Sequence, residues 1–338
     1  MTMPANSAAE PMPAASASSS GTPRGRRMRI THERVLAVLL ACEIVLFAII
    51  GSNFLTLANA GEIVRASAEV GLIALALTPV ILTGGIDLSV GSLLGLSAVI
   101  FGVTWKDGGW PIAAAAVAAL ATGLAGGGLN AWLIARFGIP PLIVTLGTYS
   151  LFRGLAEGVT GGVRNYSNFP ESFLFLGQGG FGPAPSQLIV LVLAAIAAWL
   201  FVHRSTAGRI VRTIGFSTDG ARYAGLPVTR TTALVYLLSG LAAAAASLLY
   251  VARLGQAKAD AGTGFELMAI TAVILGGTSI FGGRGTIGGT LLGLAMLSVL
   301  QNGLRLSDLP AELAGVLTAA LLIVALGANR FLGDQDHS

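Results

Sequence analysis

The amino-acid sequence predicts an all-α, polytopic membrane protein with about ten transmembrane helices. Of its 338 residues, 54% are hydrophobic and only 11% are charged, and the mean hydropathy is +0.78. So little polar surface cannot coat a water-soluble globule. A helix needs roughly 20 apolar residues to cross the hydrocarbon layer, so ten crossings use about 200 residues, which is near the apolar share of this chain.

The charge pattern indicates membrane topology rather than nucleic-acid binding. The formal net charge is +4, but the arginines lie in short runs between apolar segments instead of on one face. The single cysteine, Cys42, excludes an internal disulfide, and the 46 glycines suit close helix contacts in lipid.

The first 29 residues predict a disordered, basic cytoplasmic tail. They are rich in Ala, Ser and Pro and end in Arg24, Arg26, Arg27 and Arg29. A cleaved signal peptide is the alternative, because Arg26 and Arg27 resemble a twin-arginine start, but the many apolar segments that follow disfavour it. We expect a transmembrane domain at residues 30–330 and a short cytoplasmic tail at residues 331–338.

Ten apolar segments follow the basic tail. They cover residues 35–52, 66–83, 90–105, 111–135, 141–159, 186–203, 231–252, 267–281, 286–304 and 310–328. Alternating sides from a cytoplasmic amino terminus places 13 of the 20 basic residues on the cytoplasmic side. Basic loops resist translocation, so we expect both termini to be cytoplasmic.

A short motif indicates internally repeated halves. Gly84, Gly85 and Gly91, with the Leu-Leu-Gly-Leu that follows, recur 198 residues later from Gly282 onward. Duplicated halves with Gly-broken segments are how many transporters build a central pathway, although a chance match of such common residues is the alternative. The number of predicted spans between the two copies implies that both have the same orientation in the membrane.

The sequence lacks the residues that ATP hydrolysis and metal binding require. A phosphate-binding loop needs a lysine directly after a glycine, whereas Lys106 and Lys258 follow Trp105 and Ala257. The three histidines have no metal-ligand spacing, and no G-x-S-x-G turn is present. We therefore expect no enzyme, no metal and no cofactor, and any ATP must be hydrolysed by a partner.

Asp87 interrupts the apolar pattern at the repeated motif. A carboxylate at membrane depth is costly, so it should face protein, water or a partner. Asp87 and Ser89 either cap the next helix by accepting backbone N–H bonds, which Gly84 and Gly85 permit by turning the chain, or act in transport.

A polar stripe is predicted on the helix that starts at Pro140 and Pro141. Thr145, Tyr149, Arg153 and Glu157 recur at four-residue steps on one face. Hydroxyls and charged groups suit a sugar's hydroxyl groups, and Tyr149 can stack on a sugar ring. The alternative is an ordinary Arg153–Glu157 pair near the outer rim.

The longest predicted cytoplasmic loop, residues 203–230, carries five arginines. It is either only a basic anchor or also a docking knob, because residues 219–223 can form a short helix ended by Gly225.

These stretches together resemble the ribose-type sugar permeases of bacterial ABC importers, a family that includes permeases for other pentoses, rhamnose and autoinducer 2. The specific pieces are LTGGIDLSVGS at residues 82–92, the stretch 130–147 through GIPPLIVTLG, and residues 265–285 ending in LGGTSIFGGRG. The related branched-chain amino-acid permeases share the late Gly-rich segment, whereas the early signature is similar to the sugar branch. Two residues depart from the pattern, Ser217 where Asn is expected and Met268 where Asp is expected, so the sugar is not identified.

The resemblance implies an ABC importer permease in the bacterial inner membrane. Such permeases pair as homo- or heterodimers, sit on cytoplasmic ABC ATPase subunits, and receive sugar from a periplasmic sugar-binding protein. Membrane lipid is the other expected partner, and nucleic acid is not. Residues 215–226 would form the coupling segment, with Gly215, Asp219, Arg222 and Gly225 as its candidate residues. The candidate pathway residues are Asp87, Asn130, Thr145, Tyr149 and Arg153.

Two alternatives for the function stay open at this point. A secondary ion-coupled transporter needs titratable groups near the midplane, where Glu43 and Glu69 are the carboxylates available. A branched-chain amino-acid-type ABC permease is the other alternative.

Overall fold

The structure, a computed structural model, describes residues 32–307, 313, 315–317 and 320. The predicted tails at residues 1–29 and 331–338, and most of the predicted segment 310–328, lie outside these residues.

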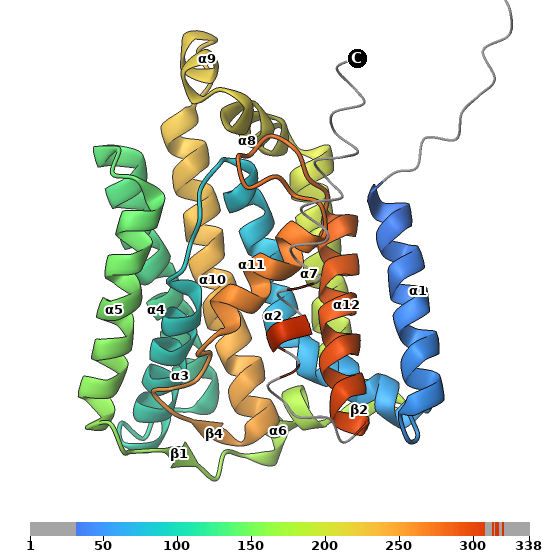
Figure 1. The fold of residues 1–338 in the computed structure, drawn as a ribbon. Helices are drawn as coiled ribbons and strands as arrows, with labels where there is room; N and C mark the ends of the chain where they lie inside the picture. Colours follow the sequence, from blue (N-terminus) through green and yellow to red (C-terminus); the bar gives the residue numbers. More distant parts are fainter. Residues whose placement is uncertain (1–31, 308–312, 314, 318–319, 321–338) are drawn as a thin grey trace, which may run out of the picture. The chain divides into compact units, whose positions relative to one another are not determined.

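The described chain is mainly helical, with four two-residue strands (Figure 1). In chain order the elements are α1 (His32–Ile50), α2 (Leu57–Leu82), α3 (Val90–Lys106), α4 (Ile112–Ala131), the π-helix η1 (Trp132–Arg136), α5 (Pro141–Thr160), β1 (Tyr166–Ser167), α6 (Glu171–Gln178), β2 (Gly180–Phe181), β3 (Ala184–Pro185), α7 (Ser186–Trp199), the π-helix η2 (Leu200–Arg204), α8 (Thr206–Phe216), α9 (Thr218–Tyr223), α10 (Val228–Leu254), β4 (Gln256–Ala257), α11 (Phe265–Leu275) and α12 (Ile287–Leu306).

Nine of the ten predicted apolar segments correspond to helices, so the all-α polytopic class is confirmed. Within the described residues, five helices are long and apolar enough to cross a membrane: α2, α4 with η1, α7 with η2, α10 and α12. The helices α3 and α11 are shorter, because glycine-rich segments interrupt the chain before α3 and after α11. The amphipathic α6 and α8 were not predicted, since neither has a long apolar run.

Helix α10 lies at the centre of the packing and contacts α2, α3, α4 and α6. Its contact with α4 is made by backbone: a Cβ atom added at Gly127 would lie 2.6 Å from the carbonyl oxygen of Tyr236. Gly123 of α4 and Gly240 of α10 are also too close to each other for side chains. Such close approach of small residues is how helices associate in lipid, where apolar burial gives little driving force.

The two copies of the glycine motif meet in space. The backbone N–H of Gly283 donates to the carbonyl oxygen of Leu82 at 2.9 Å, beside α8 and α9. We call this side of the bundle the α9 end (Figure 1). Both α3 and α12 run from it toward the opposite end, where the end of α12 meets the α1–α2 turn through a bond from Ser52 Oγ to Leu306 O. The two copies therefore face the same way, as the span count predicts.

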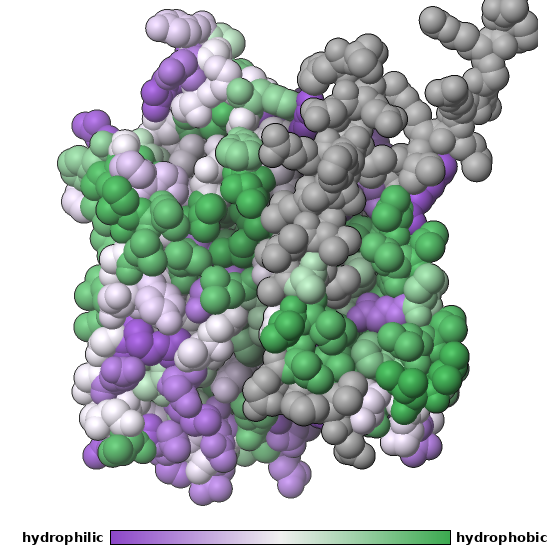
Figure 2. All heavy atoms as spheres, viewed as in Figure 1, coloured by the Kyte–Doolittle hydropathy of each residue, from purple (hydrophilic) through white to green (hydrophobic). Residues whose placement is uncertain are grey.

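The opposite end is closed by short connections. Strand β1 pairs antiparallel with β4. An aromatic cluster of Phe101, Trp105, Phe169 and Phe173 has ring centroids 4.7 to 5.6 Å apart, with Phe169 stacked on Phe101 and Trp105. On the face shown in Figure 2, hydrophilic side chains gather at this end, and hydrophobic side chains cover much of the surface between the ends.

Candidate functional site

The candidate site is built on the interruption between α2 and α3. Helix α2 contains Pro79 and ends at Leu82, and Gly84 follows with φ +81°, a left-handed conformation that glycine adopts without strain. The chain then runs without helical structure until α3 begins at Val90. Its backbone polar groups must therefore find partners on neighbouring helices.

Asp87 is buried at this interruption and accepts three hydrogen bonds. Its Oδ1 accepts from the backbone N–H of Ser89 at 3.0 Å and from Ser89 Oγ at 2.6 Å. Its Oδ2 accepts from Ser239 Oγ of α10 at 2.9 Å. The carboxylate thus ties the interruption to the central helix.

The network continues from Ser89 to α4 and α5. Asn130 Nδ2 donates to Ser89 Oγ at 2.8 Å, and Thr148 Oγ1 donates to Asn130 Oδ1 at 2.8 Å. All of these side chains are buried. One continuous chain of hydrogen bonds therefore joins α10, the interruption, α4 and α5.

The predicted helix cap is formed by neither side chain. The carboxylate of Asp87 accepts the backbone N–H of Ser89, which precedes the first residue of α3, and Ser89 makes no side-chain cap for α3. The Ser89 hydroxyl is already used, because it donates to Asp87 and accepts from Asn130.

The five candidate pathway residues separate into two groups. Asp87 and Asn130 share the network, and Thr145 Oγ1 donates to the carbonyl oxygen of Ile86 at 3.1 Å. Tyr149, half-buried, and Arg153 lie farther along α5. Arg153 Nη1 donates to the carbonyl oxygens of Ala259 and Ala261.

The alternative Arg153–Glu157 pair is not formed among the described residues. The Arg153 guanidinium points to the loop before α11, whereas Glu157 is exposed. That loop packs so closely on α3 that a Cβ atom at Gly95 would lie 2.8 Å from both Ala261 O and Arg153 Nη1. Arg153 therefore fastens the loop before α11 to α3, the helix that follows the interruption.

A cavity of about 260 Å³, lined by both polar and apolar residues, lies at the α9 end of the interruption. Its lining includes Thr83, Gly85, Pro141, Arg222 and Tyr236. The hydroxyl of the buried Tyr236 has no hydrogen-bond partner in the described part of the chain and lies against Gly85. The cavity has hydroxyl donors and a guanidinium, groups that suit a hydroxylated ligand.

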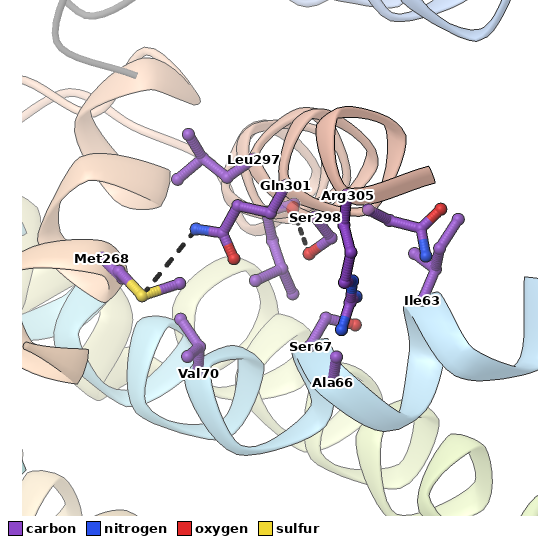
Figure 3. Close-up of a pocket in the computed structure, with 11 residues that line it drawn as sticks. Ile63, Ala66, Ser67, Val70, Met268, Leu297, Ser298, Gln301 and Arg305 are labelled. Atoms are coloured by element: carbon purple, nitrogen blue, oxygen red, sulfur yellow. Dashed lines mark hydrogen bonds between the residues drawn. The ribbon is translucent and has the colours of Figure 1, made fainter. Parts of the chain in front are cut away.

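A second pocket, between α2, α11 and α12 near the opposite end, is too small for a sugar (Figure 3). Its volume of about 30 Å³ has room for water. Met268, where the family pattern has Asp, lies at its edge, and Gln301 Nε2 is 3.9 Å from its sulfur.

The two carboxylates expected near the midplane differ. Glu69 is fully buried, and its Oε1 lies 2.7 Å from Nε of Arg253 on α10. Glu43, on α1, has both carboxylate oxygens buried without a hydrogen-bond partner within the described residues. Only Glu69 is therefore held in an ion pair there.

The candidate coupling residues lie on two helices. Gly215 is in the last turn of α8, where a Cβ atom would overlap Leu82 O and Gly283 N. Asp219 and Arg222 form an exposed ion pair of 3.3 Å on α9, and Gly225 follows with φ +72°. The predicted short helix ended by Gly225 is therefore present, and Tyr223 on it is 93% exposed.

Sequence reasoning missed Thr148, Ser239 and Tyr236. Each lies within a long apolar helix, where a single hydroxyl is common and carries no periodic signal. The three-residue step from Tyr236 to Ser239, which puts both on one face of α10, is the weak signal available. No group of three metal-binding side chains occurs among the residues that the structure describes.

Comparison with known proteins gives matches along most of the chain. Residues 59–326 match the family model described as branched-chain amino acid transport system / permease component. The autoinducer 2 import system permease protein LsrD of Photorhabdus luminescens is 40% identical over 308 residues, covering 88% of this chain and 91% of the relative. The LsrD proteins of Yersinia pseudotuberculosis (strain YPIII) and Yersinia pestis (strain Pestoides F) are 39% and 38% identical over 307 residues, with the same coverage. No solved structure matches.

Proposed function

Because the chain belongs to the family of branched-chain amino acid transport system permease components, in its ribose-type sugar branch, we propose that it moves autoinducer 2 or a related sugar-like molecule. It is a permease of the ABC importer class and not an enzyme. The observation that carries the proposal is the near full-length likeness to autoinducer 2 import permeases. Pentoses and rhamnose are the other substrates whose uptake should be compared with that of autoinducer 2.

The proposed pathway runs along α5 and the interruption before α3. Asp87, Asn130 and Thr145 hold the interruption in place, since their polar groups bond to each other and to backbone. Tyr149 and Arg153 lie farther from the α9 end on the same helix. The cavity beside Tyr236 and Arg222 would be the exit chamber.

The proposed docking element for the ATPase subunits is α9. It projects beyond α10 (Figure 1), and both Tyr223 and the neighbouring Phe216 are largely exposed. Gly215 joins this element to both glycine turns, because its backbone packs on Leu82 and on Gly282 and Gly283. Movement of α8 and α9 would therefore reach both interruptions directly.

The proposed orientation places the α9 end in the cytoplasm. Arginines that gather there include Arg136, Arg204, Arg209, Arg212, Arg222 and Arg230, as expected for cytoplasmic loops. The opposite end, closed by β1 and β4, would then receive cargo from a periplasmic binding protein.

A second permease chain is proposed to cover α5. This helix packs on α3 and α4, while Leu146, Leu151 and Leu155 are exposed, as are the polar Ser150 and Glu157. Polar groups on a membrane-facing surface favour contact with protein or water over lipid.

Uptake by reconstituted vesicles tests the function. Vesicles that contain the permease, its ATPase subunits and the binding protein should accumulate labelled autoinducer 2 only when ATP is supplied on the side of the ATPase subunits. A proton uncoupler should not change this uptake. Uptake by the permease alone, or its loss on uncoupling with ATP maintained, would favour an ion-coupled transporter. Uptake of a pentose in preference to autoinducer 2 would overturn the substrate assignment alone.

A further inference from the structure

One face of α10 carries a row of hydroxyl groups into the cavity at the α9 end. Thr229, Thr232 and Tyr236 all line this cavity. They stand three and four residues apart, so they share one face of the helix. Thr229 is exposed, Thr232 is half-buried and Tyr236 is fully buried. The row therefore runs inward along α10 from an exposed rim, over a rise of about 10 Å.

The hydroxyls of this row have no hydrogen-bond partner among the described residues. No side-chain hydrogen bond joins Thr229 or Thr232 to another described residue, and the Tyr236 hydroxyl is buried without a partner. Thr83 and Thr218 also line the cavity, but their hydroxyls donate to nearby backbone carbonyls. Buried polar groups are nearly always hydrogen-bonded, and leaving one unpaired costs free energy. The row is therefore available to a ligand.

Another part of the lining is apolar and comes from η1 and the turn into α5. It consists of Ile134, Ile139, Pro140 and Pro141. A sugar ring has hydroxyls at its edge and C–H groups on its faces, so it matches a cavity that combines a hydroxyl row with an apolar surface. The volume of about 260 Å³ is just below the range of about 300–1,000 Å³ typical of drug-sized ligands. The cavity thus suits a molecule of monosaccharide size.

The charges at the cavity favour an uncharged ligand. Arg222 is the one charged side chain in its lining among the described residues. Its Nη1 lies 3.3 Å from the carboxylate of Asp219, so the pair adds no net charge. A phosphorylated ligand would have to compete with Asp219 for this guanidinium.

Gly85 covers the innermost hydroxyl of the row in this structure. A Cβ atom added at Gly85 would overlap the Tyr236 hydroxyl oxygen. Gly85 belongs to the interruption before α3, and Leu82, three residues earlier, packs on Gly215 of α8. A shift of α8 that moves this turn would uncover the hydroxyl.

We infer that this cavity is a binding site for the cargo on its way out, in which Thr229, Thr232 and Tyr236 bind hydroxyls of a small, uncharged, polyhydroxylated molecule. The inference rests on the proposed function and deepens it by naming the residues that hold the cargo. Tyr236 binds a cargo hydroxyl once Gly85 moves away, and the two threonines bind it nearer the rim.

Equilibrium binding to the complete permease–ATPase complex in nanodiscs, without the binding protein, tests the inference. The probes are labelled autoinducer 2 and labelled ribose, each measured without nucleotide and with a non-hydrolysable ATP analogue. Tyr236→Phe and Thr232→Val each remove one hydroxyl and keep the size of the side chain. Each should weaken binding about threefold to tenfold, the loss expected for one hydrogen bond. Because the Tyr236 hydroxyl is unpaired in this structure, Tyr236→Phe should not lower the thermal unfolding midpoint.

Matched variants make the same changes away from the cavity. Tyr250→Phe lies farther along α10 and Thr122→Val lies on α4, and neither residue lines the cavity. Both should bind the probes as the parent does.

Four binding results would overturn the inference: no binding of either probe by the parent, unchanged affinity in Tyr236→Phe or in Thr232→Val, an equal loss in the matched variants, or tighter binding of ribose 5-phosphate than of ribose. A lower unfolding midpoint for Tyr236→Phe would reveal a structural partner for the hydroxyl and would also overturn it. Uptake by the parent complex tests the proposed function separately, so normal uptake with unchanged binding in both variants would refute this inference alone.

Discussion

Asp87 shows how a buried carboxylate is kept in a membrane helix bundle. It accepts from Ser89 twice and from Ser239 once, so its oxygens are satisfied without water. A buried donor that loses its acceptor costs about 1–3 kcal/mol of stability. The network therefore stabilises the interruption as a defined conformation rather than a loose loop.

Replacing Asp87 should distinguish its hydrogen bonds from its charge. In Asp87→Asn the remaining oxygen can accept from Ser89 and the new amide can donate to Ser239, so we expect a small fall in the unfolding midpoint. Asp87→Leu leaves the donors of Ser89 and Ser239 unpaired and should lower stability by about 1–3 kcal/mol for each orphaned group. Thermal unfolding in detergent measures both; equal midpoints for the two variants would contradict the proposed role.

The Glu69–Arg253 pair gives a second prediction at the residue scale. Arg253→Gln leaves the fully buried Glu69 carboxylate without its partner, which should cost about 3–5 kcal/mol. The double variant Glu69→Gln with Arg253→Gln should regain most of that loss, because no charge is then left buried. Denaturant unfolding of the parent, the two single variants and the double variant measures the coupling free energy between Glu69 and Arg253. If the loss in the double variant equals the sum of the two single losses, the two side chains are not coupled.

At the scale of elements, the contact between α8 and the two glycine turns is the main constraint. Gly215, Leu82 and Gly283 meet through backbone atoms, leaving no space for a side chain. Packed contacts of this kind move together instead of deforming. The α8–α9 element and both helix interruptions should therefore shift as one unit.

Gly215→Val should separate ATP hydrolysis from uptake. The added side chain displaces α8 from the glycine turns, so we expect ATPase activity to persist while uptake falls at least about tenfold, a loss that corresponds to only ~1.4 kcal/mol. Gly61→Ala is the control, since a Cβ atom there meets nothing closer than 3.9 Å. Assembly is checked by co-purification of the ATPase. Normal uptake by an assembled Gly215→Val complex would refute the role of the contact between α8 and the two glycine turns in coupling.

At the scale of the whole molecule, the described chain leaves one face of α5 open. A Cβ atom at Gly147, Gly154 or Gly158 would meet nothing within 4 Å. Small residues on an open helix face allow another backbone to approach closely. A second chain on this face would place two copies of the polar stripe beside one pathway.

Cysteine crosslinking tests this arrangement. With Cys42, the single native cysteine, replaced by Ser, Gly154→Cys should form disulfide-linked dimers in membranes on mild oxidation. Val117→Cys, on an exposed position of α4, should remain monomeric under the same conditions. Gel mobility then distinguishes a link between two copies from a link to a different permease chain. Crosslinking at Val117→Cys alone would move the interface to α4.

Much of the architecture was predictable from local pattern. Hydropathy indicates nine helices that the structure contains, and Pro140, Gly225 and the Gly84–Gly85 pair mark boundaries that the backbone confirms. These features are local, because a membrane helix makes its backbone hydrogen bonds within its own segment. Its presence therefore depends chiefly on the composition of that segment. The absence of a phosphate-binding loop could also be read directly, since that loop is a contiguous motif.

The partners of the polar residues depend on the packing instead. Asp87 bonds Ser239 across 152 residues, and Arg153 bonds a loop 106 residues away in place of the adjacent Glu157. Such pairs are set by which helix faces meet, and hydroxyls in apolar helices leave no periodic mark in the sequence. Composition and periodicity thus determine that this chain is a helical membrane protein with many spans, whereas the three-dimensional packing decides which polar groups brace its helix interruptions.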